Sequence, residues 1–226
     1  MKDYLIEFNK ELKAKLAGSL VKVDQIKKPH AKEYLSKLAR EGAIDKVTWG
    51  WYWIPVKIKD AQDFLRRDRN FKIIADQTAA SFWNQDFVHR EVHIMKVKDR
   101  SLARALEEFG KKKGWRIHAI YTDEQLKYVT INGLRIEDME QTIIDCLRNY
   151  AFEDAFAALY VNRERIKIEE IKRRYYWDRL PRSNIRIRQI LEYAWERMNG
   201  ESGRKIDDDF IKNNIDDALS KVIELG

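Results

Sequence analysis

The stretch that decides the fold reads AKEYLSKLAREG at residues 31–42 and AIDKVTWGWYWIP at residues 43–55. In the first part, apolar residues recur at every third or fourth position, which predicts an amphipathic helix that Gly42 ends. In the second part the period changes to a run rich in β-branched and aromatic residues, interrupted at Gly50. This change predicts a two-stranded hairpin directly after the helix.

The residues before this stretch complete a recognisable order of elements. Residues 3–17 carry one apolar stripe at helical spacing, which predicts a first helix. Residues 19–28 predict a short strand and then a short helix capped by Asp24. Helix, short strand, short helix, turn, second helix and hairpin is the order of a winged helix-turn-helix, which we therefore predict for residues 1–59.

The rest of the chain predicts an α+β domain over residues 60–162 and a helical extension over residues 163–226. Helices are predicted over residues 60–69, 72–83, 101–113 and 137–160, the last broken near Asn149, and strands over residues 91–97, 115–121 and 128–136. Asn132-Gly133 is the strongest hairpin signal in the chain. The expected fold class is α+β: an N-terminal winged helix-turn-helix, an α+β domain and a helical C-terminal extension.

Composition places the chain among globular proteins and shows where its charge lies. The 226 residues include 44 Lys and Arg against 37 Asp and Glu, for a net charge of +7, and 44% are hydrophobic. This is too apolar for a disordered polycation. The excess lies in residues 1–59, with 13 basic and 7 acidic residues, and in residues 163–200, with 11 and 6. Such uneven basicity favours a polyanionic partner, usually nucleic acid, although lysine-rich helices are also ordinary solvated surfaces.

The same features bound the cellular setting. The longest apolar runs are shorter than the roughly 18 residues of a membrane span, and the N-terminal segment is charged, without an apolar signal region. One cysteine excludes an internal disulfide framework. We expect a cytoplasmic protein without membrane contact.

The predicted helix, from about His30 to Glu41, would present a basic face opposite its apolar stripe. In a winged helix that face enters the major groove, where Lys and Arg reach bases and phosphates. The predicted groove-facing residues are Lys32, Ser36, Lys37 and Arg40, and the predicted backbone or wing contacts are Lys27, Lys28, Lys46 and Thr48. The alternative is a winged domain that binds protein and leaves its lysine face solvated.

A second basic block combines arginine with aromatic residues over residues 172–188. Its candidate contact residues are Arg173, Arg174, Arg179, Arg182, Arg186 and Arg188. Such a pattern fits nucleic acid, an acidic partner, or the acidic tail of the same chain at Asp207-Asp-Asp209.

Catalytic and metal-binding patterns are weak. His89 and His93 are four residues apart, but the sequence around them predicts a strand, in which they are too far apart to chelate one ion. Cys146 lies on an apolar helix and is expected to be buried, and Asp145 is expected to cap a helix or form a salt bridge. We predict no enzyme, no metal and no cofactor, with a nucleic-acid-processing enzyme as the less favoured alternative. We also expect Trp49, Trp51 and Trp53 to share one packed face.

Two parts of the sequence resemble the AbiEi-type antitoxins, transcriptional regulators of type IV toxin–antitoxin systems. The first is residues 34–42 (YLSKLAREG) followed by residues 44–55. The second is residues 133–136 (GLRI) followed by residues 140–147 (EQTIIDCL). The likeness covers roughly residues 20–160, and short motifs of this kind are moderately specific.

This resemblance implies a DNA-binding regulator that represses its own operon. It also implies a genetic partner, a nucleotidyltransferase-like toxin, without requiring a direct complex. A homodimer is a further candidate assembly. Two positions depart from the family pattern, because Trp49 and Gln141 stand where arginine is usual.

Overall fold

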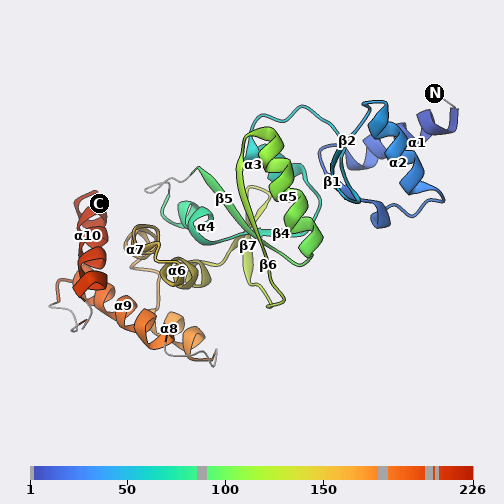
Figure 1. Ribbon diagram of the computed structural model, residues 1–226. Coiled ribbons are helices and arrows are strands. Elements are labelled where there is room, and N and C mark those ends of the chain that lie inside the picture. Colours follow the sequence, from blue (N-terminus) through green and yellow to red (C-terminus); the bar gives the residue numbers. More distant parts are fainter. Residues whose placement is uncertain (1–2, 86–90, 178–182, 202–205, 207–208, 226) are drawn as a thin grey trace. The chain divides into compact units, whose positions relative to one another are not determined.

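The computed structural model describes residues 3–85, 91–177, 183–201, 206 and 209–225 (Figure 1). It confirms a mixed α+β protein with two sheets, a three-stranded one in the order β1-β3-β2 and a five-stranded one in the order β6-β5-β4-β8-β7. Two compact units are present. The first comprises residues 1–73, 95–124 and 132–134, and the second comprises residues 74–94, 125–131 and 135–226. The predicted domain boundaries at residues 59 and 162 remain predictions.

The first unit begins with the elements that the sequence predicts. They are α1 (Asp3–Leu16), β1 (Leu20–Lys22), a 3-10 turn (Val23–Gln25), α2 (Ala31–Arg40), β2 (Asp45–Thr48) and β3 (Trp51–Trp53). One difference concerns the short helix expected to follow Asp24. It is only the 3-10 turn, because the backbone becomes extended at Ile26, and Lys27 and Lys28 therefore lie in a loop that leads into α2.

A compact apolar cluster joins these elements. Its buried residues are Leu5, Phe8, Leu12, Val21, Leu35, Leu38, Ile44, Tyr52 and Ile54. Each large aliphatic or aromatic side chain removed from water in this way contributes about 1.5–3 kcal/mol. The apolar stripes of α1 and α2 thus meet the inner face of the small sheet, as the helical spacing in the sequence requires.

The tryptophans of the hairpin separate into two groups. Trp51 and Trp53 are each 1% exposed, whereas Trp49 is 85% exposed. Thr48 pairs with Trp51 across the two strands, so Trp49 and Gly50 form the connecting loop, and Gly50 has a φ of 75° that favours glycine. The expectation that all three tryptophans share a packed face is therefore wrong for Trp49, because the strand ends before it.

Further helices and strands follow in the middle of the chain. They are α3 (Ala61–Arg67), β4 (Lys72–Ile74), α4 (Asp76–Trp83), β5 (Val92–Val97), α5 (Arg100–Lys113) and β6 (Arg116–Tyr121). The helix predicted over residues 72–83 is wrong in its first turn, which is strand β4. Every residue of β4 is buried, and a short apolar run of this kind has no periodicity that separates a buried strand from a helix.

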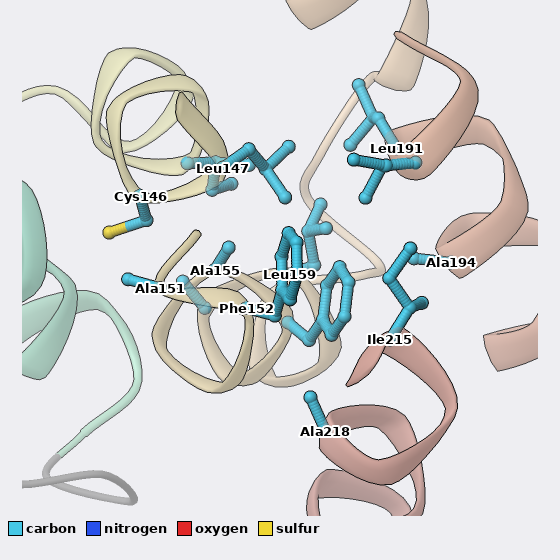
Figure 2. Close-up of a cluster of buried hydrophobic side chains, with 14 of the residues drawn as sticks. Cys146, Leu147, Ala151, Phe152, Ala155, Leu159, Leu191, Ala194, Ile215 and Ala218 are labelled. Atoms are coloured by element: carbon cyan, nitrogen blue, oxygen red, sulfur yellow. The ribbon is translucent and has the colours of Figure 1, made fainter. Parts of the chain in front are cut away.

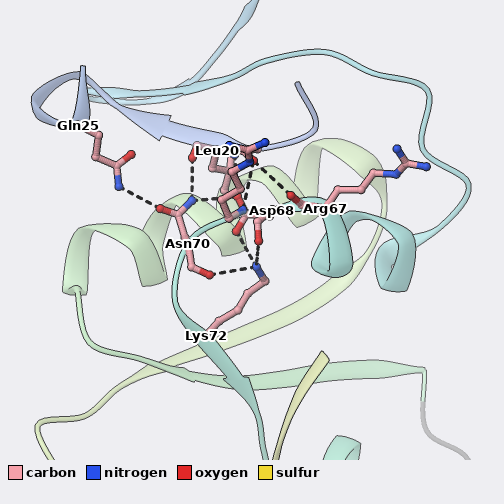
Figure 3. Close-up of polar contacts among 8 residues, drawn as sticks. Leu20, Gln25, Arg67, Asp68, Asn70 and Lys72 are labelled. Carbon is pink, nitrogen blue, oxygen red and sulfur yellow. Dashed lines mark hydrogen bonds and ion pairs between the residues drawn. The ribbon is translucent and has the colours of Figure 1, made fainter. Parts of the chain in front are cut away.

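A buried polar network attaches β1 to the segment between α3 and β4 (Figure 3). Lys72 Nζ donates to a carboxylate oxygen of Asp68 at 2.7 Å and to its backbone carbonyl at 2.6 Å. The other Asp68 oxygen accepts from the backbone N–H of Leu20 at 2.8 Å and from the Asn70 amide at 2.9 Å. Because both charged side chains are at most 5% exposed, these hydrogen bonds compensate a costly desolvation.

The second unit is mainly helical. After β7 (Tyr128–Ile131) and β8 (Leu134–Glu137), it contains α6 (Met139–Arg148), α7 (Phe152–Val161), α8 (Ile168–Trp177), α9 (Ser183–Met198) and α10 (Asp209–Leu225). Figure 2 shows part of its core, where Phe152 and Leu159 of α7 gather with Leu191 of α9 and Ile215 of α10. The predicted break near Asn149 and the predicted hairpin at Asn132-Gly133 are both present. Among the described residues, no helix is long and apolar enough to cross a membrane.

Candidate nucleic-acid interface

Helix α2 separates its apolar and polar residues as predicted. Leu35 and Leu38 are fully buried on its inner side. Lys32, Ser36 and Arg40 are exposed, and Lys37 is half-buried. The four residues predicted to face a groove therefore lie on the part of α2 that the protein core leaves uncovered.

Among the described residues, the cations of this face form no ion pair. They are Lys32, Lys37 and Arg40, and the same holds for Lys27 and Lys46. An exposed cation without an acidic partner retains its full charge for an outside anion. We call these five residues the N-terminal basic face.

Lys28 is the exception among the predicted contacts. Its ammonium group pairs with the Glu11 carboxylate on α1 and lies 5.8 Å from the centre of the Phe8 ring. The hydrogen bond and the charge of Lys28 lower the pKa of Glu11 below its usual value. Lys28 therefore fastens the loop before α2 to α1, and its charge is already partly neutralised.

A groove of about 450 Å³ runs along α1 beside this loop. Its lining includes the apolar side chains of Leu16 and Ile26, the carboxylate of Glu11, and the cations Lys15, Lys27 and Arg69.

The β2–β3 hairpin is held firmly within the first unit. Lys112 Nζ, from α5, donates to the carbonyl oxygens of Lys46 at 2.7 Å and Val47 at 3.1 Å. The backbone N–H of Val23 donates to the carbonyl of Gly50 at 3.0 Å. Of the predicted hairpin contacts, Lys46 is exposed and Thr48 is half-buried.

Trp49 at the tip of this hairpin is a surface residue that sequence reasoning missed. The available signal was its position directly before Gly50, which marks it as a loop residue once Gly50 is recognised as the centre of the hairpin. The alternation of Trp49, Trp51 and Trp53 obscured that signal, because it is typical of a continuous strand.

In the second basic block, two of the described cations have an acidic partner, unlike those of the N-terminal basic face. Lys172 and Arg188 both pair with the buried carboxylate of Glu192, at 3.3 and 2.9 Å. Arg173 is exposed. Arg179 and Arg182 lie outside the described residues, and the structure describes the backbone but not the side chains of Arg174 and Arg186.

Helix α10, which begins at the end of the acidic stretch, contributes to the core of the second unit. Helix α10 buries Ile211, Ile215 and Leu219 in the second unit, and Asp216 accepts a hydrogen bond from the Tyr193 hydroxyl at 2.6 Å. Burial and this carboxylate raise the pKa of Tyr193 to about 12. Asp207 and Asp208 lie outside the described residues, so the predicted pairing of the tail with the arginines stays a prediction.

The second unit buries several carboxylates, which bears on the enzymatic alternative. Asp145 accepts from Gln141 at 3.0 Å and pairs with Arg148 at 3.3 Å, as expected for a structural carboxylate. Asp76 accepts a hydrogen bond from Asn149. Across the parts of the chain that the structure describes, no three His, Cys, Asp or Glu residues are placed to hold a metal ion.

Cys146 is completely buried, as predicted. Burial, reinforced by the negative charges of Asp76 and Asp154, raises the pKa of its thiol well above the usual value. The thiol therefore stays protonated at neutral pH, and a protonated thiol is a poor nucleophile.

No protein-family model matches this chain, and no curated protein matches it in sequence.

Proposed function

We propose that the chain is a sequence-specific DNA-binding transcriptional regulator whose first 59 residues act as a winged helix-turn-helix. The observation that carries the proposal is the N-terminal basic face, five cations without an ion pair among the described residues. Its supporting frame is the order of α1, β1, α2 and the hairpin around one apolar cluster. The 3-10 turn and the loop at Lys27 take the place of the short first helix of the motif.

In this proposal α2 is the recognition helix. Lys32, Ser36, Lys37 and Arg40 face the major groove, where lysine and arginine bind guanine edges or phosphates. Lys27 and Lys28 contact the phosphate backbone before α2, and Lys46 and Thr48 contact it from the hairpin. The phosphate contacts fix the position of the protein, and the base contacts select the sequence.

The biological setting is proposed from the sequence resemblance. An antitoxin-like autorepressor of a type IV toxin–antitoxin operon would bind its own promoter and act as a non-enzymatic partner of a nucleotidyltransferase-like toxin. A reporter gene fused to that promoter should be repressed when the chain is expressed.

Duplex binding as a function of salt tests the central claim. Binding to a random-sequence duplex pool is measured by fluorescence anisotropy. The logarithm of the association constant should fall linearly with the logarithm of the salt concentration. Replacing Lys37 and Arg40 together by alanine should weaken binding about tenfold or more at low salt. The plot of the logarithm of the association constant against the logarithm of the salt concentration should become less steep by about 2. The matched control is Lys10→Ala with Lys13→Ala, two exposed lysines on α1 that lie outside the proposed face.

Equal losses in the two double variants would remove the assignment of α2 to the groove. Weak binding with no dependence on salt would instead favour the alternative, a protein-interaction module that uses the winged domain and the block at residues 163–200.

A further inference from the structure

Trp49 has the largest exposed fraction among the exposed large hydrophobic side chains that the structure describes, at 85%. The same hairpin buries Trp51 and Trp53 almost completely, and Trp49 is the tryptophan of the hairpin that stays exposed. Within the described residues, the Trp49 ring makes no hydrogen bond and no ring contact. Single exposed apolar side chains are ordinary on protein surfaces, so the case for a partner of Trp49 depends on the loop that carries it and on the charge of its hairpin.

The loop that carries Trp49 is fixed before any partner arrives. Thr48 and Trp51 pair on either side of it, the Gly50 carbonyl accepts from Val23, and Lys112 binds the carbonyls of Lys46 and Val47. Trp51 is itself held by a hydrogen bond from its indole N–H to the Ser101 hydroxyl at 3.1 Å. A ring presented on a preorganised tip loses little conformational entropy when it binds.

The charge near this ring favours a polyanion as its partner. Residues 20–59 carry nine Lys and Arg against four Asp and Glu, and Lys46 on the same hairpin is exposed and unpaired within the described chain. A tryptophan that binds another protein is more often surrounded by apolar residues than by charged ones, because the cores of protein–protein interfaces are depleted of charge. Bases offer an aromatic face beside a line of phosphates, which matches an exposed ring on the same hairpin as the exposed Lys46.

We infer that Trp49 is a wedge that inserts between neighbouring base pairs when the hairpin contacts duplex DNA, unstacking and bending the duplex at that step. The inference rests on the proposed DNA-binding function and adds the indirect component of its specificity. A wedge favours steps that unstack easily, so flexible pyrimidine–purine steps at the hairpin contact would bind better than stiff ones.

The test compares two short duplexes of the same mixed sequence, one fully paired and one with a central two-base mismatch next to 2-aminopurine. The mismatch lowers the cost of unstacking. The full-length protein should therefore bind the mismatched duplex about five- to tenfold more tightly than the paired one and raise 2-aminopurine fluorescence. Trp49→Ala should lose this preference, and Trp49→Phe should keep most of it.

The Trp49 variants should fold like the wild type, because a side chain that is 85% exposed contributes little to the core. Circular dichroism checks that they are folded. Tyr150→Ala, which removes a 62% exposed aromatic ring from the second unit, is the matched control and should keep the wild-type preference. A preference that persists in Trp49→Ala would overturn the wedge and leave DNA binding intact. Failure of the wild-type chain to bind any duplex would overturn both proposals. Loss of self-association in Trp49→Ala, with duplex binding unchanged, would assign the ring to a protein contact instead.

Discussion

The two basic regions of this chain use their charge in different ways. On the N-terminal basic face, Lys32, Lys37 and Arg40 have no acidic partner among the described residues. In the second block, Lys172 and Arg188 converge on Glu192, whose side chain is 6% exposed. Among the side chains that the structure describes, the cations of the N-terminal basic face thus have no ion pair, whereas Lys172 and Arg188 of the second block are paired with a buried carboxylate.

This difference shows that net charge alone is a poor guide to a binding surface. A cation that pairs with a buried carboxylate is part of the fold, and its removal should appear first as lost stability. A cation that has no partner contributes little to stability, and its removal should appear first as lost affinity. The following predictions test that distinction, beginning with the largest effect.

The largest effect is expected at the buried pair of the first unit. Asp68→Ala leaves the Lys72 ammonium group buried without its carboxylate and should lower the free energy of unfolding by about 3–5 kcal/mol. Urea denaturation followed by circular dichroism measures this loss. The control is Asp24→Ala, which removes a 66% exposed partner of Lys22 and should cost less than about 1 kcal/mol. Similar losses in the two variants would show that burial does not distinguish these pairs.

A smaller loss of stability is expected in the second basic block. Glu192→Gln removes the charge shared by Lys172 and Arg188 and should cost about 1–3 kcal/mol. Glu170→Gln is the control, since its pair with Lys167 is long, at 3.9 Å, and exposed. If Glu192→Gln left stability unchanged but strengthened duplex binding, as expected for Glu11→Gln, the two basic regions would be alike.

The same substitution should be sensitive to pH. Burial opposes ionisation of Glu192, but hydrogen bonds and charge from Arg188 and Lys172 outweigh it and lower its pKa below the usual 4.5. A lowered pKa means that the folded state favours the ionised form. The stabilisation is therefore complete above about pH 4.5 and is lost as the pH falls through the folded-state pKa. The difference between wild type and Glu192→Gln should shrink on acidification over that window.

The smallest effect is expected at Lys28, the cation of the N-terminal region that already has an acidic partner, Glu11. Glu11→Gln removes the partner of Lys28 and adds one more unpaired cation to the N-terminal basic face. Duplex affinity should rise about two- to threefold at low salt, with a slope steeper by about 1. Glu7→Gln, an equal charge change at an exposed position of α1, should raise affinity less. Equal gains would mean that only total charge matters.

Predictions based on periodicity agree with the structure where one face of an element is buried. The stripes of α1, α2 and α5 and the hairpin at Asn132-Gly133 all lie as expected. Strand β4 was missed because both of its faces are buried, so it has no alternation of apolar and polar residues. Trp49 was misplaced because the alternation of Trp49, Trp51 and Trp53, typical of a continuous strand, outweighed the turn signal of Gly50. The side chains of the predicted basic face are exposed as expected, but the sequence could not show that Lys28 already has a partner on α1.

The sequence by itself determined the class of fold, the order of elements in the first 59 residues, and the outward direction of the α2 cations. It could do so because helical and strand periods are local properties of neighbouring residues. Only the tertiary structure decided which cations are neutralised. Lys72 pairs with Asp68, four residues earlier in the sequence. Lys28 pairs with Glu11, and Lys172 pairs with Glu192, across different helices or loops. Coulomb interactions depend on distance and burial in space rather than on separation along the chain. The folded arrangement therefore determines which part of the +7 charge remains for a partner.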